Sequence, residues 1–257
     1  MLCRFLLREC LDRGVHLHHP AAALSTMVDV RNELSSVRIA ELDSSTETDI
    51  PCTRVIITAG AWSGQVFETL FPHSELKLPV SSIAGHSLVL KSPRWSKEVE
   101  ERGCHAIFTT SRPGFSPEIF SRMDGTIYLA GLNSPEMPLP KLPLDRQIVP
   151  ESIVELREFA KKLLGADADE DDLEVEREGL CFRPVTESGT PIITRIDDSH
   201  LGVGVSTRPG ADGGVYCAAG HGPWGISLSL GTGMVLAEMV QGRRLSADVE
   251  SLALFDI

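Results

Sequence analysis

Apolar positions recur at helical spacing in four segments of the chain. This spacing predicts helices over residues 2–13, 62–70, 151–164 and 225–241. Glycine follows three of these segments, at Gly14, Gly165 and Gly242, and glycine suits the left-handed position after a helix end. All four segments therefore have the expected periodicity, and three of them also have the stop signal of a helix end.

Shorter apolar runs, several of them rich in β-branched residues, predict strands. The candidates are residues 15–18, 22–31, 35–42, 53–60, 87–91, 106–110, 118–122, 126–132, 174–178, 191–195 and 213–219. Val55, Ile56 and Ile57 are continuously apolar, as in a strand that is buried on both faces. Asp124-Gly125 favours a hairpin turn, since this pair tolerates positive φ.

The order of these elements indicates a mixed α/β (α+β) fold. Strand–turn–helix units stand near both ends, at residues 53–70 and 213–241, and a strand meander with one helix lies between them. We expect a Rossmann-like nucleotide-binding layer from residues 1–80 and 200–257, and a mixed or antiparallel sheet domain from residues 81–199.

Charge and cysteine content narrow the classes of partner. The chain has 24 basic and 36 acidic residues, a net charge of −12, which argues against nucleic acid or an anionic membrane surface as partner. The acidic run at residues 167–172 is expected to be a solvated loop or helix flank. Six dispersed cysteines form no C-x-x-C pair, so we expect reduced thiols, a cytoplasmic protein and no zinc motif. No apolar run is long enough to span a bilayer, and the N-terminus lacks the pattern of a signal peptide.

The segment G-H-G-P-W-G-I at residues 220–226 carries the strongest chemical signal. It follows a predicted strand and opens a helix, where unpartnered amide N–H groups and the helix dipole can receive an anionic or electron-rich oxygen. The alternative is an ordinary strand–helix turn whose glycines permit close packing. A second glycine turn, T-A-G-A-W-S at residues 58–63, stands at the carboxyl end of a buried strand, where α/β sheets bind ligands. In the alternative interpretation Trp62 belongs to the core.

Three further side chains are candidates for chemistry. Arg183 could bind a carboxylate with its guanidinium, and the alternative is a structural salt bridge with an acid such as Glu187. His86 and His221 are candidate proton acceptors, although a lone histidine is more often structural. No metalloprotease motif, P-loop or Ser-His-Asp motif is recognisable, and no metal site is expected.

Taken together, these residues resemble the FAD-dependent oxidoreductases of the D-amino-acid-oxidase, glycine-oxidase and sarcosine-oxidase family, and in particular its fungal oxidoreductases. The resemblance covers nearly the whole chain in order. Its segments are residues 6–15, 22–23, 55–63, 79–90, 179–193 and 220–226. Ser188 departs from the family pattern, which often has Asp at that position.

The resemblance implies FAD as cofactor and an amine or amino acid as substrate. It implies that Arg183 binds the substrate carboxylate and that Cys181 aligns with a cysteine that holds flavin covalently in some members. The alternative for Cys181 is a small buried hydrophobe. The cofactor-contacting positions that it implies are Ala22, Ala23, Ala59, Gly60, Trp62, Gly220, His221, Gly222, Trp224, Gly225 and Ile226.

One family segment is not found before Gly60. The family opens with a strand, G-x-G-x-x-G, a helix and a strand that ends in an acid, and this unit binds the pyrophosphate and ribose. We therefore expect an N-terminally truncated member, with only part of the FAD-binding layer and impaired cofactor binding. The expected reaction is hydride transfer from the amine-bearing carbon to the flavin. The alternatives are a non-catalytic fragment or interaction module, and a flavin enzyme of another substrate class, such as one acting on a nucleoside amine. The electron acceptor and the oligomeric state are not predicted.

Overall fold

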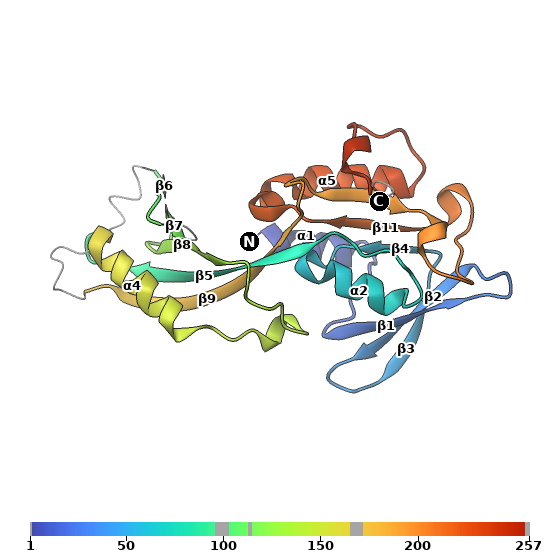
Figure 1. The fold of residues 1–257 in the computed structure, drawn as a ribbon, viewed down its shortest axis with the longest axis horizontal. Coiled ribbons are helices and arrows are strands. Elements are labelled where there is room, and N and C mark those ends of the chain that lie inside the picture. The colour runs from blue at the N-terminus through green and yellow to red at the C-terminus, as the bar shows by residue number, and fades with distance from the viewer. Residues whose placement is uncertain (1, 96–102, 113–114, 165–171, 255–257) are drawn as a thin grey trace. The chain divides into compact units, whose positions relative to one another are not determined.

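The chain forms two compact units in a computed structural model that describes residues 2–95, 103–112, 115–164 and 172–254 (Figure 1). Unit 1 comprises Met1–Pro79, Pro191–Ala219 and Gly225–Ile257. Unit 2 comprises Val80–Thr190 and Gly220–Trp224. The predicted helix stop at Gly165 lies outside the described residues, as does the predicted acidic run apart from Asp172.

Unit 1 contains a three-stranded antiparallel sheet of order β1-β2-β3. Its strands are β1 (Ala21–Val28), β2 (Leu34–Glu41) and β3 (Glu47–Pro51). The hydrophobic pattern predicts the first two strands but not β3, because E-T-D-I-P has a single large apolar residue. The predicted strand over residues 15–18 is wrong: these residues form no strand.

A second sheet of unit 1 has the order β10-β11-β4. The central strand β11 (Gly214–Ala219) runs parallel to β4 (Arg54–Ile57) and antiparallel to β10 (Ile192–Ile196). Its central position explains why all six of its residues are buried. The pairing with β11 also assigns β10 to unit 1, whereas the predicted domain division had placed it in the middle domain.

Helices follow both parallel strands. A 3₁₀ turn η1 (Gly60–Trp62) and helix α2 (Ser63–Leu70) follow β4, and η5 (Gly222–Trp224) and α5 (Gly225–Val240) follow β11. Helix α5 packs against β10 and β11, where Leu236 joins Ile193 and Tyr216 in a buried cluster (Figure 1). Helix α1 (Leu2–Asp12), also in unit 1, buries none of its residues.

Unit 2 is built on a five-stranded antiparallel sheet of order β6-β7-β8-β5-β9. Its strands are β5 (Ser81–Lys91), β6 (Ala106–Phe108), β7 (Phe115–Ser121), β8 (Ile127–Ser134) and β9 (Glu174–Val185). Helix α4 (Pro150–Leu164) covers one face of this sheet, as Figure 1 shows for β5 and β9. Leu156 of α4 is completely buried in a cluster with Leu88, Leu90 and Leu129 of the sheet.

Strand β9 corrects one feature of the sequence interpretation. The prediction ended this strand at residue 178 and placed Arg183 just before a turn, but β9 continues to Val185 because it pairs with β5 over its whole length. Arg183 is therefore held by a strand ladder. The predicted mixed α/β class is confirmed by the parallel strand pair of unit 1 and the antiparallel sheet of unit 2.

None of the helices among the described residues combines the length and the apolar character that a membrane crossing requires.

Candidate functional site

Neighbouring strands of unit 2 place several polar side chains on one face of the sheet. Gly85 on β5 stands directly opposite Asn133 on β8 and directly opposite Cys181 on β9. Directly opposed residues share a face, and alternate residues of one strand do so as well, so Arg183 lies on the same face as Cys181. The structure therefore groups the predicted Cys181 and Arg183, and it adds Asn133, which the sequence analysis missed.

The guanidinium of Arg183 has a neutral partner. Its Nη1 donates a hydrogen bond of 3.1 Å to Asn133 Oδ1 in a half-buried environment. The proposed alternative, a salt bridge to Glu187, does not form, and no carboxylate in the described part of the chain forms an ion pair with Arg183. The positive charge of this side chain is therefore not compensated within those residues.

Gly85 provides the space in which these two side chains meet. A Cβ atom at this position would lie 3.1 Å from Asn133 Oδ1 and 3.9 Å from the guanidinium carbon of Arg183. Since 3.1 Å is tighter than an ordinary carbon–oxygen contact, even a methyl group would push Asn133 aside. The glycine is required here by close approach, not by its backbone conformation.

Cys181 is exposed on the same face, so the alternative of a small buried hydrophobe is wrong. Its Sγ lies 3.7 Å from the carbonyl oxygen of Gly85. An exposed thiol two residues from Arg183 is compatible with the predicted covalent attachment of flavin, which stays a prediction.

His86 has a different environment from its neighbour Gly85. It points to the face that α4 covers, is 2% exposed, and its Nε2 accepts a hydrogen bond of 3.2 Å from the backbone N–H of Val149. Burial lowers the pKa of His86, so the ring is neutral and its proton resides on Nδ1. This geometry favours the structural alternative, because the lone pair that would accept a substrate proton already binds Val149. The catalytic role stays a prediction.

The two predicted glycine turns follow adjacent parallel strands of unit 1. Cys217 of β11 pairs with Ile57 of β4, so the carboxyl ends of the two strands lie at the same edge of the sheet. Gly60 after β4 and Gly222 after β11 have φ angles of +57° and +54°, which side chains rarely adopt, and a Cβ at either would meet nothing within 4 Å. The turn at Gly60 thus brings bare backbone to the sheet edge where ligands of such folds bind, and Gly222 follows the adjacent strand along the chain.

The apolar side chains in and just after the turn that follows β11 are exposed to solvent. Trp224 is 64% exposed and Ile226 is 83% exposed. Burial lowers the pKa of His221, so its imidazole is neutral near pH 7. Within unit 2, η5 contacts β9, the strand that carries Cys181 and Arg183. This contact brings the predicted flavin turn to the strand that carries Arg183.

The same turn contains a spacing that the sequence analysis overlooked. Residues 220–225 read G-x-G-x-x-G, the glycine pattern of dinucleotide-binding turns, after a strand and at the start of a helix. That fingerprint also requires a second parallel strand after the helix. In the described residues no strand follows α5, so the pattern here is a glycine turn without the rest of the unit.

Ala22 and Ala23, the predicted adenine neighbours, line a hollow of about 360 Å³ in unit 1. Most of the other lining side chains come from β2, β3 and β4, among them Val37, Ile39 and Ile50. Two alanines leave room beside the strand, and the walls are largely apolar. A flat heterocycle such as adenine is compatible with such a surface.

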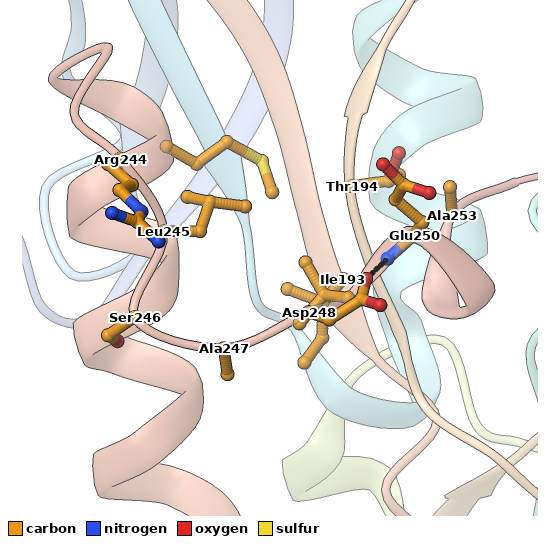
Figure 2. A pocket seen from close by; sticks show the side chains of 11 residues that line it. Ile193, Thr194, Arg244, Leu245, Ser246, Ala247, Asp248, Glu250 and Ala253 are labelled. Carbon is orange, nitrogen blue, oxygen red and sulfur yellow. Dashed lines mark hydrogen bonds between the residues drawn. The ribbon is translucent and has the colours of Figure 1, made fainter.

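A further hollow in unit 1, of about 570 Å³, contains none of the predicted residues (Figure 2). Figure 2 shows Arg244 and Leu245 on one side of it and Thr194, Glu250 and Ala253 on the other. Its polar groups are in part used internally, since the N–H of Glu250 donates to Asp248 Oδ1 at 3.0 Å and the hydroxyl of Thr194 donates to the carbonyl oxygen of Arg195. We assign no chemistry to this hollow.

Comparison with known proteins identifies what this arrangement is similar to. Residues 1–239 match the family model described as "FAD dependent oxidoreductase". The Schizosaccharomyces pombe protein "Putative oxidoreductase C1F5.03c" is 29% identical over 206 residues, which are 78% of this chain and 45% of that protein. A D-amino acid dehydrogenase of Granulibacter bethesdensis is 31% identical over 99% of this chain and 51% of its own length.

The fold has solved counterparts as well. Glycine oxidase from Geobacillus kaustophilus superposes with a TM-score of 0.70 at 18% identity, covering 99% of this chain and 57% of that one. The chain thus spans about half the length of the relatives that it matches.

Proposed function

The chain belongs to the family of FAD-dependent oxidoreductases, and from this premise we propose that it carries the substrate-carboxylate site and the flavin-facing turn of an enzyme that oxidises an amino acid or a related amine. The substrate is a small molecule, and the reacting carbon is the one that bears the amine. Transfer of a hydride from this carbon to bound FAD, with loss of a proton from the amine nitrogen, would leave an imine, which water would hydrolyse to a carbonyl compound and ammonia or an amine.

One observation carries the proposal: the guanidinium of Arg183 has no carboxylate partner among the described residues and lies on the same sheet face as the exposed Cys181. An uncompensated half-buried cation favours an anionic ligand, and a planar guanidinium suits a carboxylate. Arg183 would bind the substrate carboxylate and so fix the orientation of the adjacent amine-bearing carbon.

The residues of the two glycine turns, and those of the hollow beside Ala22 and Ala23, fit parts of a flavin dinucleotide. FAD, when bound, supplies the hydride acceptor of the reaction. The backbone around Gly220, Gly222 and Gly225 would hold the electron-rich edge of the flavin, because the positive end of the α5 dipole lies at this turn and glycines let a ligand approach the backbone. Gly60 and Trp62 would approach the cofactor from the neighbouring turn, and Ala22 and Ala23 would pack on adenine. Cys181 is the proposed position for covalent attachment.

The test combines cofactor binding with a matched pair of substrates. The purified chain is mixed with FAD, quenching of flavin emission is measured, and oxidation of glycine is compared with that of methylamine, which lacks only the carboxylate. We expect quenching only at high FAD concentrations, in keeping with the predicted impairment of cofactor binding. For Arg183→Ala we expect a rise of the KM for glycine by roughly tenfold to a hundredfold, as expected for the loss of a charged hydrogen bond. The KM for methylamine should not change.

A second function is favoured by the exposed apolar side chains of unit 1. Leu2, Phe5, Leu7 and Leu11 of α1 are 40–58% exposed, which suits a non-catalytic interaction module. Unquenched flavin emission at saturating FAD, together with absent turnover of every amine offered, would support this second function and refute the first.

A further inference from the structure

We propose that Asn133 is a positioning residue for Arg183, and that its uncharged amide keeps the guanidinium available for a carboxylate ligand. This inference rests on the proposed function of Arg183 as the carboxylate-binding residue. It identifies a second determinant of substrate class, one that favours amino acids and other carboxylates over neutral amines.

The geometry of unit 2 singles out Asn133 among the neighbours of Arg183. The Oδ1 atom of Asn133 is the acceptor of the Arg183 Nη1 hydrogen bond at 3.1 Å, across the gap that Gly85 leaves open between β8 and β9. Each of the three strands contributes one part of the arrangement: an acceptor, a space and a cation. The flexible side chain of Arg183 is thereby fixed at Nη1, while the other N–H groups of its guanidinium stay available for a ligand.

A bulge in β8 sets this register. His86 pairs with Leu132 and Ser87 pairs with Ala130, so Gly131 is an extra residue in the ladder. Gly131 has a φ of +110°, and a Cβ there would lie 2.0 Å from the backbone oxygen of Ser116, so only glycine fits this bulge. If Gly131 instead paired with His86, as in a regular ladder, Leu132 would stand opposite Gly85. The bulge therefore re-aims β8 so that Asn133 faces Arg183.

The chemical identity of Asn133 matters as much as its position. An amide oxygen accepts a hydrogen bond from the guanidinium without adding negative charge, whereas an aspartate of nearly the same shape would form an ion pair with it. Aspartate at position 133 would thus occupy the cation that the substrate carboxylate needs. Asn133 holds Arg183 in place and leaves its charge for the ligand.

The experiment measures carboxylate binding to the full chain without relying on turnover. Dissociation constants for propionate and for propanamide, its uncharged counterpart of similar shape, are obtained from NMR chemical-shift titrations of wild type, Asn133→Asp, Asn133→Ala and Arg183→Ala. Met123→Asp is the matched control, since it adds the same charge at a hairpin position that is 85% exposed. Thermal unfolding establishes that each variant is folded.

We expect wild type to prefer propionate over propanamide, and Asn133→Asp to weaken propionate binding by roughly tenfold to a hundredfold. Asn133→Ala should weaken propionate binding by a smaller factor, and Met123→Asp should bind as wild type does. Propanamide binding should be the same in all five proteins. If Asn133→Asp does not fold, Asn133→Ala alone must still weaken propionate binding.

Two negative results have different meanings. If wild type prefers propionate and Arg183→Ala abolishes that preference, but Asn133→Asp and Asn133→Ala bind propionate as wild type does, the inference is overturned and the proposed role of Arg183 stands. The inference is also overturned if Met123→Asp weakens binding as much as Asn133→Asp. If wild type shows no preference that depends on Arg183, the proposed function fails, and the positioning role of Asn133 fails with it.

Discussion

Arg183 and His86 of unit 2 are ionisable side chains with neutral hydrogen-bond partners. Arg183 is charged and His86 is neutral, so only Arg183 can attract an anionic ligand. Arg183 retains its positive charge beside the amide of Asn133, on the sheet face opposite α4. His86 accepts a hydrogen bond from the backbone N–H of Val149 on the face that α4 covers, and burial keeps the imidazole neutral. The alternation of strand residues separates a cation suited to ligand binding from a histidine suited to packing.

The first prediction concerns the pH dependence of His86. Burial lowers its pKa below the ordinary value of 6.5, so at pH values below 6.5 the unfolded chain binds more protons than the folded chain does. The free energy of unfolding should therefore fall as pH decreases from 6.5 towards the folded-state pKa. In His86→Gln an amide oxygen can accept the Val149 N–H without titrating, so this part of the pH dependence should disappear.

Urea denaturation at about pH 7.5 and about pH 5 measures this difference, since His86 is the group removed from titration over that interval. Burial also lowers the pKa of His221, but that contribution is present in both proteins and cancels when the two slopes are compared. An equal loss of stability in wild type and in His86→Gln would contradict the prediction.

At the scale of elements, periodicity predicted helices better than it predicted strands. Helix α4 was placed within one residue at its start, because apolar residues recur on one face. The prediction left Pro150 outside the helix, although proline suits a first helical turn. Strand β3 and the second half of β9 were missed because their sequences, E-T-D-I-P and C-F-R-P-V, do not alternate regularly. These residues are extended because a neighbouring strand offers backbone partners, and a single-segment pattern does not contain that information.

The same limit applies to the site. The glycine turns and Arg183 were identified from local motifs, whereas Asn133 stands in N-S-P-E with no chemical motif around it. Its role follows from the β5–β8 register, which depends on the bulge at Gly131, and from the length of β9. An alternating pattern that allowed for a glycine bulge in residues 126–134 could have placed Asn133 opposite Gly85.

The second prediction tests the packing of α4 on the sheet of unit 2. Leu156 is completely buried among Leu88, Leu90 and Leu129, whereas Val154 on the same helix is 60% exposed. Leu156→Ala should lower the free energy of unfolding by about 2–5 kcal/mol, through lost burial and the cavity that remains. Val154→Ala should change it by less than about 0.5 kcal/mol.

Urea titrations of both variants beside wild type provide the measurement. Comparable effects of the two substitutions would show that α4 does not pack in solution by the face described.

At the scale of the whole molecule, unit 1 exposes much more apolar surface on its helices than unit 2 does on α4. No residue of α1 is buried, and the first ten residues of α5 include the exposed Ile226, Leu228, Leu230 and Met234. Apolar surface of this kind in water favours association. The net charge of −12 opposes association through mutual repulsion, and added salt screens that repulsion. The balance of these two effects should therefore depend on ionic strength.

The last prediction tests whether the exposed apolar residues of α1 cause self-association. Phe5 is 58% exposed among Leu2, Leu6 and Leu7, so Phe5→Glu removes apolar surface and adds negative charge at the same point. Self-association measured by sedimentation should decrease in Phe5→Glu, and most clearly at high salt, where repulsion no longer protects the wild type. The free energy of unfolding should change by no more than about 0.5 kcal/mol, because no packing is lost.

Val203→Glu is the matched control: it adds the same charge at a 93% exposed residue outside the helices, and should leave association nearly unchanged. A loss of several kcal/mol in Phe5→Glu would instead mean that α1 is packed in solution, and equal effects of the two substitutions would attribute association to charge alone.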